Sequence, residues 1–437
     1  MSGNQVIWFI VHKRRVAAGH HDGFRFIEAG RVPGVGPTPP PTHARVTGKS
    51  SSSNKRGASR VEIRSNREEN MSFFDDTVRL RRLAQEATEY AQFSRRSLLK
   101  GAAGVIGGAA FANSAVMASA EEITPPAPGK KVRIGVPLTY GPFNQPWRRG
   151  CWQIVKAVLD AGGEVVTVRG EPTKASEQAA ARALLDRGID ALVMGIYSQE
   201  SETAYIADEA HKRGIKTVGF TIPVKDSPAV MDDVWGTATT LGYFVQNYCK
   251  RQGTFAQTAE QRGYFTPFDM EVDMFELMCR YEPRMKVLPF IDGGQGTTDE
   301  ISVGRKNMLS LLQANPEPGS LAGFISWWWP FTLGAGQALK QMNRDDVPLF
   351  NHYLSTQFLE AWAAKQVPVV FSCDSPFPEI GRKTGELAVK LARGEDVPNI
   401  VYRIPVITKT PDQAAEALTE LKSMDEQAIA LLKQFGG

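Results

Sequence analysis

The sequence is poor in the residues that most often build metal and catalytic centres. Its 437 residues include only six histidines and four cysteines. Four of the histidines lie before residue 44, which leaves only His211 and His352 in the rest of the chain. No two cysteines form a C-x-x-C pair, which argues against a zinc cluster. We therefore expect no metal and no cofactor.

Two interpretations of the cysteines remain open. Separate, half-buried thiols are favoured because the four residues are widely spaced. The alternative is a single disulfide, for which Cys249 and Cys279 are the best pair, and which an oxidising compartment would permit.

The body of the chain also lacks an excess of positive charge. Residues 1–120 hold 18 of the 51 Lys and Arg but only 9 of the 47 Asp and Glu. The remainder therefore has 33 basic and 38 acidic residues, a net charge of about −5. A body of this sign has no electrostatic basis for gripping a phosphate backbone, so we expect no nucleic-acid partner.

The N-terminal region of the sequence has the composition of an export signal. Residues 1–70 mix Arg, Gly, Pro and Ser with little periodicity and should be disordered, an extension upstream of a start at Met71. Residues 71–120 then contain SRRSLLK and a weakly apolar stretch of Ala and Gly. Arg95 and Arg96 match a twin-arginine signal peptide, and the small residues of ASA (118–120) predict cleavage before Glu121.

A transmembrane anchor is the alternative for residues 101–120, which are about long enough to span a bilayer. The stretch lacks Leu, Ile and Phe density and carries Asn113 and two serines, so a cleaved signal is favoured. Residues 121–130 read as a linker.

From residue 130 onward, short apolar runs alternate with helical patterns. Strands are predicted at 132–138, 164–170, 190–195 and 216–221, with helices between them. This alternation is interrupted at 227–236 and then resumes. Further strands are expected at 263–265, 285–291, 321–327, 347–352, 367–373 and 402–404. Such alternation predicts right-handed βαβ units in parallel sheets. Two successive units imply an α/β fold of two doubly wound parallel-sheet lobes with a cleft between them.

Four stretches of the body resemble one known family. They are VRIGVPLTYGPF, ASEQAAARALLDRGIDALVMGIYSQES, ADEAHKRGIKTVGF and SPFPEIGRKTGELAVKLARGED. In order and spacing they are similar to the periplasmic sugar-binding family, the ribose-type receptors of ABC importers, which have the type I periplasmic binding protein fold.

The resemblance implies a division of the body into two lobes joined by three hinge strands. Lobe 1 should comprise 130–232 plus 376–404, and lobe 2 should comprise 233–375. Residues 405–437 should pack back on both. It also implies a monomer that binds a small molecule in the cleft and delivers it to an inner-membrane permease.

The sequence departs from that family where charged residues hold the sugar. Uncharged or aromatic residues stand there instead, at Thr221, Trp328, Trp329 and Asn351, and Ser375 replaces a hinge glutamine. The ligand-binding residues that the resemblance implies are Tyr140, Phe143, Trp147, Thr221, Trp328, Trp329, Asn351 and Asp374, with Gln295 as a further candidate. Aromatic faces stack on sugar rings, and they also cage methylated amines.

Ordinary structural roles compete with several of these assignments. Trp147 is equally well explained as a packing residue of its own helix. Three consecutive tryptophans at 327–329 cannot all face one core if a strand runs through them, so at least one should line the cleft. The GGQG run at 293–296 lacks the ending of a phosphate-binding loop and is favoured as a turn. Asp232 and Asp233 are favoured as a solvated pair at the hinge over a catalytic dyad.

The favoured function is therefore that of a periplasmic solute-binding protein for a sugar or polyol-like ligand, working with an ABC importer. The alternative is a sensory binding protein, with an aromatic cage for a methylated amine, that signals to a sensor kinase. An enzyme is disfavoured because the body has no H-E-x-x-H, G-x-S-x-G or P-loop motif. A repressor is disfavoured because an export signal stands where a DNA-binding helix pair would precede the first strand.

Overall fold

The computed structural model describes residues 81, 83–85, 131–141, 144–195, 197–294 and 299–436. All of them belong to one compact unit, Arg67–Gly437. The expected extension, nearly all of the signal-peptide region and the linker lie outside the described residues. No described helix has the length and apolar character needed to cross a membrane.

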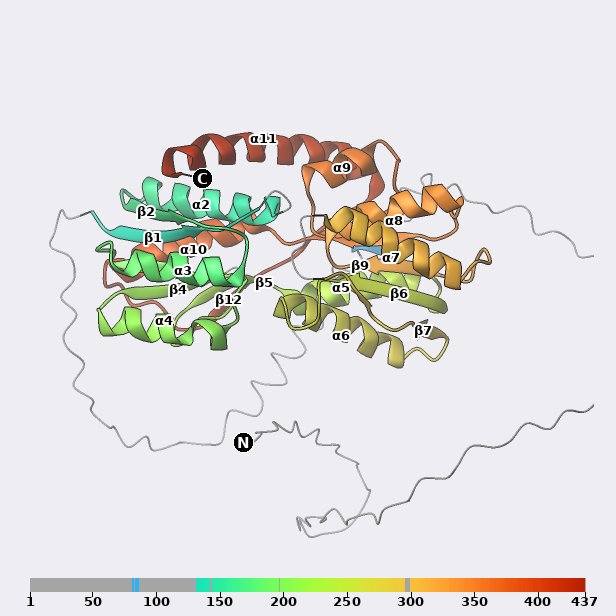
Figure 1. Cartoon of the computed structure of the whole chain (residues 1–437), viewed down its shortest axis with the longest axis horizontal. Coiled ribbons are helices and arrows are strands. Elements are labelled where there is room, and N and C mark those ends of the chain that lie inside the picture. Colours follow the sequence, from blue (N-terminus) through green and yellow to red (C-terminus); the bar gives the residue numbers. More distant parts are fainter. Residues whose placement is uncertain are drawn as a thin grey trace, which may run out of the picture. The chain divides into compact units, whose positions relative to one another are not determined.

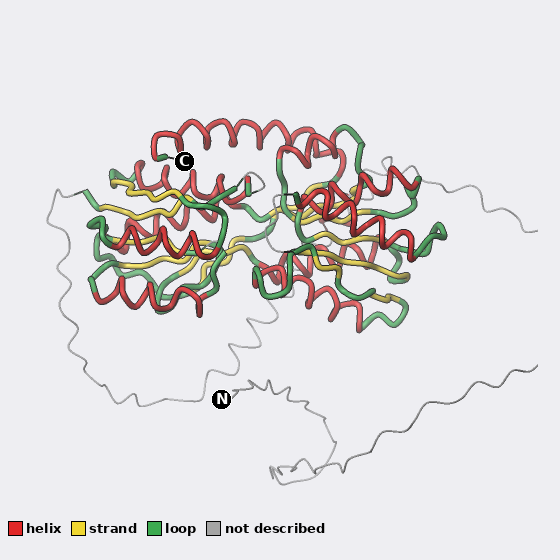
Figure 2. Tube along the Cα trace, in the orientation of Figure 1, coloured by secondary structure: helices red, strands yellow, loops and turns green. Residues whose placement is uncertain are grey.

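Two separate sheets form the frame of this unit (Figures 1 and 2). The first has six parallel strands in the order β12-β5-β4-β3-β1-β2. These strands are β1 (Arg133–Leu138), β2 (Glu164–Arg169), β3 (Ala191–Met194), β4 (Lys216–Phe220), β5 (Ala229–Asp232) and β12 (Val401–Ile404). The helices α2 (Gln145–Asp160), α3 (Lys174–Leu185), α4 (Glu200–Lys212) and α10 (Phe377–Ala392) accompany this sheet. We refer to this assembly as lobe 1.

The second sheet has the order β13-β11-β10-β9-β6-β7, with β8 also paired to β6. Its strands are β6 (Gly253–Ala259), β7 (Met285–Val287), β8 (Ile291–Asp292), β9 (Gly323–Ser326), β10 (Leu349–His352), β11 (Val369–Asp374) and β13 (Ile407–Lys409). Only β13 runs antiparallel among the described strands. Its helices are α5 (Val234–Tyr248), α6 (Thr266–Arg280), α7 (Glu300–Ala314), α8 (Trp329–Met342) and α9 (Thr356–Ala363). We refer to this assembly as lobe 2.

The chain passes three times between the lobes, after β5, after β11 and between β12 and β13. The last helix, α11 (Ala414–Leu432), then packs on both α2 of lobe 1 and α9 of lobe 2, as Figure 1 shows at the top of the view. The crossings and this helix limit how far the two lobes can separate.

The predicted α/β alternation is confirmed, with four local corrections. The strand expected at 263–265 is wrong, because those residues form a turn and the strand is β6, which ends four residues earlier in the chain. The expected strand 285–291 is divided into β7 and β8. Strand β5 lies within 227–236, where the alternation was expected to be interrupted, and β13 lies within the C-terminal segment 405–437. All four cysteines are free thiols, so the alternative disulfide is not formed.

Close helix contact in lobe 1 depends on small residues. A Cβ atom at Gly381 of α10 would overlap the carbonyl oxygen of Gly150 in α2, and one at Gly385 would lie 2.8 Å from the carbonyl oxygen of Ile154. Glycine inside a helix normally costs stability relative to alanine. Here it permits the two backbones to approach.

We therefore predict that Gly381→Ala destabilises the protein by about 1–3 kcal/mol, because the new methyl group overpacks the α2–α10 contact. Lys390→Ala, at an exposed position of the same helix, is the control and should change stability by less than about 0.5 kcal/mol. Urea unfolding of both variants measures the difference. A stabilised Gly381→Ala protein would contradict this packing.

Candidate functional site

Aromatic rings from the two lobes meet where the strands of both sheets end. Trp147 of α2 lies with its ring centroid 5.5 Å from that of Trp328, 5.9 Å from Phe265 and 5.7 Å from Tyr353, all three in lobe 2. On its own lobe it contacts Phe377 at 4.7 Å. We refer to these five residues as the aromatic seam. Tilted and edge-to-face contacts of this kind are favourable, so the seam holds the lobes together.

The local sequence explains how Trp147 reaches the seam. Helix α2 begins at Gln145 with a proline in its first turn, which suits a helix start. Trp147 therefore projects from the first turn, beside the loop that follows β1. The side chain is 3% exposed, and its indole Nε1 has no hydrogen-bond partner among the described residues. A buried donor without a partner is costly, which makes this atom a candidate for a ligand contact.

The three tryptophans do not lie on one strand, contrary to the expectation from side-chain alternation. Strand β9 ends at Ser326, and Trp329 already begins α8, so no strand runs through them. All three are buried, and they point to different places. Trp327 donates to Gln257 inside lobe 2, at 3.0 Å. Trp328 lies in the seam, and Trp329 packs beside it.

Two carboxyl groups of lobe 2 lie at the seam. Trp328 Nε1 donates to Glu300 Oε2 at 2.7 Å, and Glu300 is hydrogen-bonded to Glu260. Burial raises the pKa of Glu300 to about 7, while the bonds to Trp328 and Glu260 hold it below what burial alone would give. Two hydrogen-bonded carboxyl groups share a proton, so this pair presents both a donor and acceptors.

Lobe 1 contributes a third carboxylate. Glu177 of α3 is buried and accepts hydrogen bonds from the backbone amides of Tyr197, at 3.1 Å, and Ser198, at 2.9 Å. Burial, together with Tyr264, Glu177 and Glu260, raises the pKa of Tyr197 well above its usual range. Tyr197 is therefore a neutral hydroxyl between the lobes. Its oxygen has no hydrogen-bond partner among the described residues.

Thr221 stands directly after β4 in a strained conformation. Its φ of +69° is unusual for a β-branched residue, and its side chain is buried. Its Oγ1 has no hydrogen-bond partner in the described part of the chain. Backbone strain of this kind persists where the surroundings enforce it, and it concentrates at binding sites.

The other predicted site residues lie in different surroundings. Tyr140 follows β1, is buried, and lies beneath the Arg169 guanidinium at 5.5 Å. Asn351 is fully buried, and its amide group donates two hydrogen bonds within lobe 2, to the Tyr353 carbonyl and to Ser372 Oγ. Phe143 and Gln295 lie outside the described residues. The GGQG run is therefore seen only in part.

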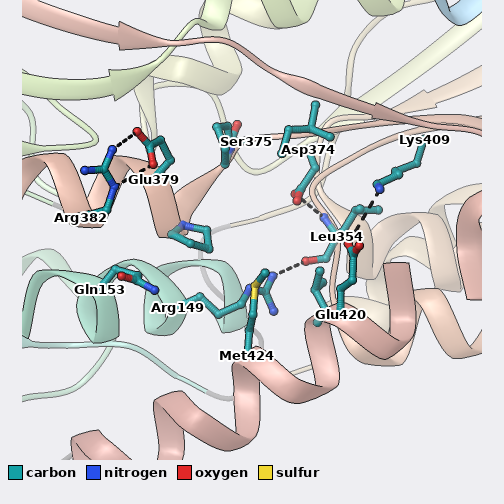
Figure 3. Close-up of a pocket in the computed structure, with 14 residues that line it drawn as sticks. Arg149, Gln153, Leu354, Asp374, Ser375, Glu379, Arg382, Lys409, Glu420 and Met424 are labelled. Carbon is teal, nitrogen blue, oxygen red and sulfur yellow. Dashed lines mark hydrogen bonds and ion pairs between the residues drawn. The ribbon is translucent and has the colours of Figure 1, made fainter. Parts of the chain in front are cut away.

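Asp374 does not belong to the aromatic seam. Its Oδ1 accepts from the backbone amide of Leu354 at 2.9 Å, and burial raises its pKa to about 6. It lines a cavity of about 280 Å³ beneath α11 (Figure 3). Arg149 of α2 reaches into this cavity and donates to the Leu354 carbonyl at 2.7 Å.

The hinge aspartates are also corrected. Asp232 and Asp233 are 3% and 2% exposed, so they are not a solvated pair. Asp232 Oδ2 accepts from Ser375 Oγ at 2.6 Å, which joins two of the three crossings between the lobes. Two consecutive acidic residues in the sequence do not indicate that both side chains are buried.

Sequence reasoning did not single out Glu260, Glu300, Glu177 or Tyr197. Glu260 directly follows β6, and the misplaced strand at 263–265 concealed its position at the sheet edge. Glu300 begins α7, four residues after the GGQG run in the sequence. Acidic residues that directly follow a strand or begin a helix at that edge were the available signal.

Two parallel sheets, three crossings and a set of buried polar groups between the lobes define a two-lobed binding protein of the type I periplasmic fold. The chain belongs to the periplasmic binding protein domain family, which matches residues 135–396. This is a family of periplasmic binding proteins and not an enzyme class. No curated protein matches the sequence.

Solved structures of solute-binding proteins share the fold. An ABC transporter solute-binding protein from Agrobacterium vitis with bound allitol has a TM-score of 0.58 at 20% identity, covering 67% of this chain and 99% of that one. The 5-methylthioribose transporter protein from Thermotoga lettingae has a TM-score of 0.58 at 16% identity, covering 70% and 93%. A protein from Bacillus halodurans with bound myo-inositol has a TM-score of 0.57 at 16% identity, covering 66% and 98%.

The raised pKa of Glu300 predicts a pH-dependent stability. In the unfolded chain this group ionises near 4.5, and in the folded protein near 7, so the folded state keeps a proton that the unfolded state loses. Its contribution to stability is therefore full below pH 4.5 and declines as the pH rises to 7. Glu300→Gln cannot ionise and should flatten that decline by up to about 3 kcal/mol.

Urea unfolding between pH 4.5 and 8 measures the effect. Glu317→Gln, an exposed residue after α7, is the matched control and should follow the wild type. An unchanged decline in Glu300→Gln would show that Glu300 is not the titrating group.

Proposed function

We propose that this protein is a periplasmic solute-binding protein that captures a sugar or polyol-like molecule between its lobes and delivers it to an ABC-type importer. The observation that carries the proposal is the division of polar groups across the seam. Lobe 1 offers three buried hydroxyl or indole groups without partners among the described residues, at Trp147, Tyr197 and Thr221. Lobe 2 offers the carboxyl groups of Glu260 and Glu300.

A ligand hydroxyl can accept one hydrogen bond and donate another. A polyhydroxylated ligand would therefore satisfy lobe 1 donors and lobe 2 acceptors at once, and only when the lobes are close. A quaternary amine has no acceptor for the donors of lobe 1, which is why we favour a polyol over a methylated amine. The fold neighbours with bound allitol and myo-inositol support the same ligand class.

The remaining parts of the proposal concern export and partners. The protein would leave the cytoplasm by the twin-arginine pathway, lose residues up to Ala120, and act as a monomer that docks on an inner-membrane permease. The boundaries expected for the two lobes, and a dispensable extension over 1–70, belong to this proposal.

The ligand class is tested on the mature chain, residues 121–437, by a thermal-shift screen of polyols and sugars against tetramethylammonium, a quaternary amine without an acceptor. A polyol present at 100 times its dissociation constant should add about 2.7 kcal/mol to the stability of the folded state. Stabilisation by the amine alone would favour the sensory alternative.

The role of Trp147 has a sharper test. Trp147→Phe keeps an aromatic ring but removes the unpartnered indole N–H, so affinity for the polyol should fall by about 0.5–1.5 kcal/mol beyond any effect on stability. Trp362→Phe is the matched control, because its indole donates to the Val369 carbonyl within lobe 2 at 2.7 Å. The control should lose stability and keep its intrinsic affinity. Calorimetric titration and urea unfolding of both variants separate the two effects, and equal losses of affinity would contradict the assignment.

Export is tested by replacing Arg95 and Arg96 together with lysine. We expect the protein to accumulate in the cytoplasm, because the paired guanidinium groups are read by the translocase. A chain that starts at Met71 should still be exported and bind ligand like the full chain. Unchanged periplasmic yield of the lysine variant would refute the signal assignment.

A further inference from the structure

Three ionisable side chains, none of them part of the seam carboxyl pair, converge at the hinge. Asp232 ends β5 of lobe 1, Glu271 lies on α6 of lobe 2, and His352 ends β10 of lobe 2. All three are buried, and each offers one ligating atom within 4.8 Å of the other two. Two carboxylates and one imidazole form a donor set that suits zinc and other divalent transition ions.

Glu271 is the second observation that points to a ligand. Its side chain is 0% exposed, and within the described part of the chain neither carboxylate oxygen has a hydrogen-bond partner. His352 Nδ1 lies 3.1 Å from Glu271 Oε1, but the geometry is not that of a hydrogen bond, and Nδ1 likewise has no partner there. A buried carboxylate without a hydrogen-bond partner is costly unless a cation or a proton neutralises it.

The other ring nitrogen is held in place. His352 Nε2 lies 3.1 Å from Ser375 Oγ, which in turn donates to Asp232 Oδ2 at 2.6 Å. A histidine whose second nitrogen is fixed by a neighbour has the usual arrangement of a metal ligand. The Nδ1–Oε1 separation of 3.1 Å is also close to the distance between neighbouring ligands of a tetrahedral zinc ion, about 3.3 Å for bonds of about 2.0 Å.

We propose that Asp232, Glu271 and His352 bind one divalent transition-metal ion, with zinc as the best-fitting ion, and that the bound ion ties lobe 1 to lobe 2 at the hinge. The site has no role in the proposed contacts with the transported ligand. Because Asp232 comes from lobe 1 and the other two from lobe 2, the ion would restrain the first crossing between the lobes.

The test uses protein purified from the periplasm, treated with chelator, and then incubated with Zn²⁺ and desalted. We expect about one zinc per chain by elemental analysis, and a higher unfolding temperature that the chelator reverses. Glu271→Gln should bind zinc at least tenfold more weakly and lose the chelator-sensitive shift. Asp273→Asn, an exposed carboxylate two residues along the same helix, is the control and should retain both.

A measurement on the wild-type protein tests the metal site even if Glu271→Gln does not fold. Incubation with Co²⁺ should give the strong visible absorption of a low-coordinate cobalt site, which added zinc displaces. Absence of bound zinc in the wild type, or equal metal loss in Asp273→Asn, would overturn the proposal. In the first case a proton on Glu271 would neutralise the buried carboxylate instead. Polyol binding is measured separately, so failure of the metal site leaves the proposed function unaffected.

Discussion

The contact of Trp147 with the aromatic side chains of lobe 2 is the interaction on which the rest of the site depends. It places the first turn of α2 against the loops that follow β6, β9 and β10. Those loops carry Glu260, Trp328 and Tyr353, so one ring from lobe 1 fixes which polar groups of lobe 2 face it. The three crossings and α11 limit how far the lobes can separate, but they do not choose the groups that meet. The seam does.

A second constraint follows from burial. Polar groups enclosed between the lobes must find partners, and the described residues supply none for Trp147 Nε1, Tyr197 OH and Thr221 Oγ1. A bound polyol would supply them, which links closure of the lobes to occupancy of the site. The proposed ligand completes a hydrogen-bond network that lobe 1 alone leaves open, and closure is favoured because the carboxyl groups of lobe 2 then bind the same ligand.

Much of the fold was predictable from the sequence because buried parallel strands appear as short apolar runs, and β1 to β4 of lobe 1 all do. Strand β6 was not, because its sequence GTFAQTA contains Gln and two Thr and lacks a continuous apolar run. Resemblance to a family also brought forward Trp147 and Trp328, which do meet at the seam. It did not find Glu260 and Glu300, because their proximity arises from the packing of separate segments. The assumption of a regular strand through the tryptophans failed because a helix starts at Trp329.

A crystal structure of the mature protein with the polyol that stabilises it best is the most direct test of a ligand site between the lobes. We expect density for one ligand molecule between Trp147 and Tyr197 of lobe 1 and the carboxyl groups of Glu260 and Glu300 of lobe 2. Ligand density in the cavity beneath α11, beside Arg149 and Asp374, with nothing between the lobes, would contradict it.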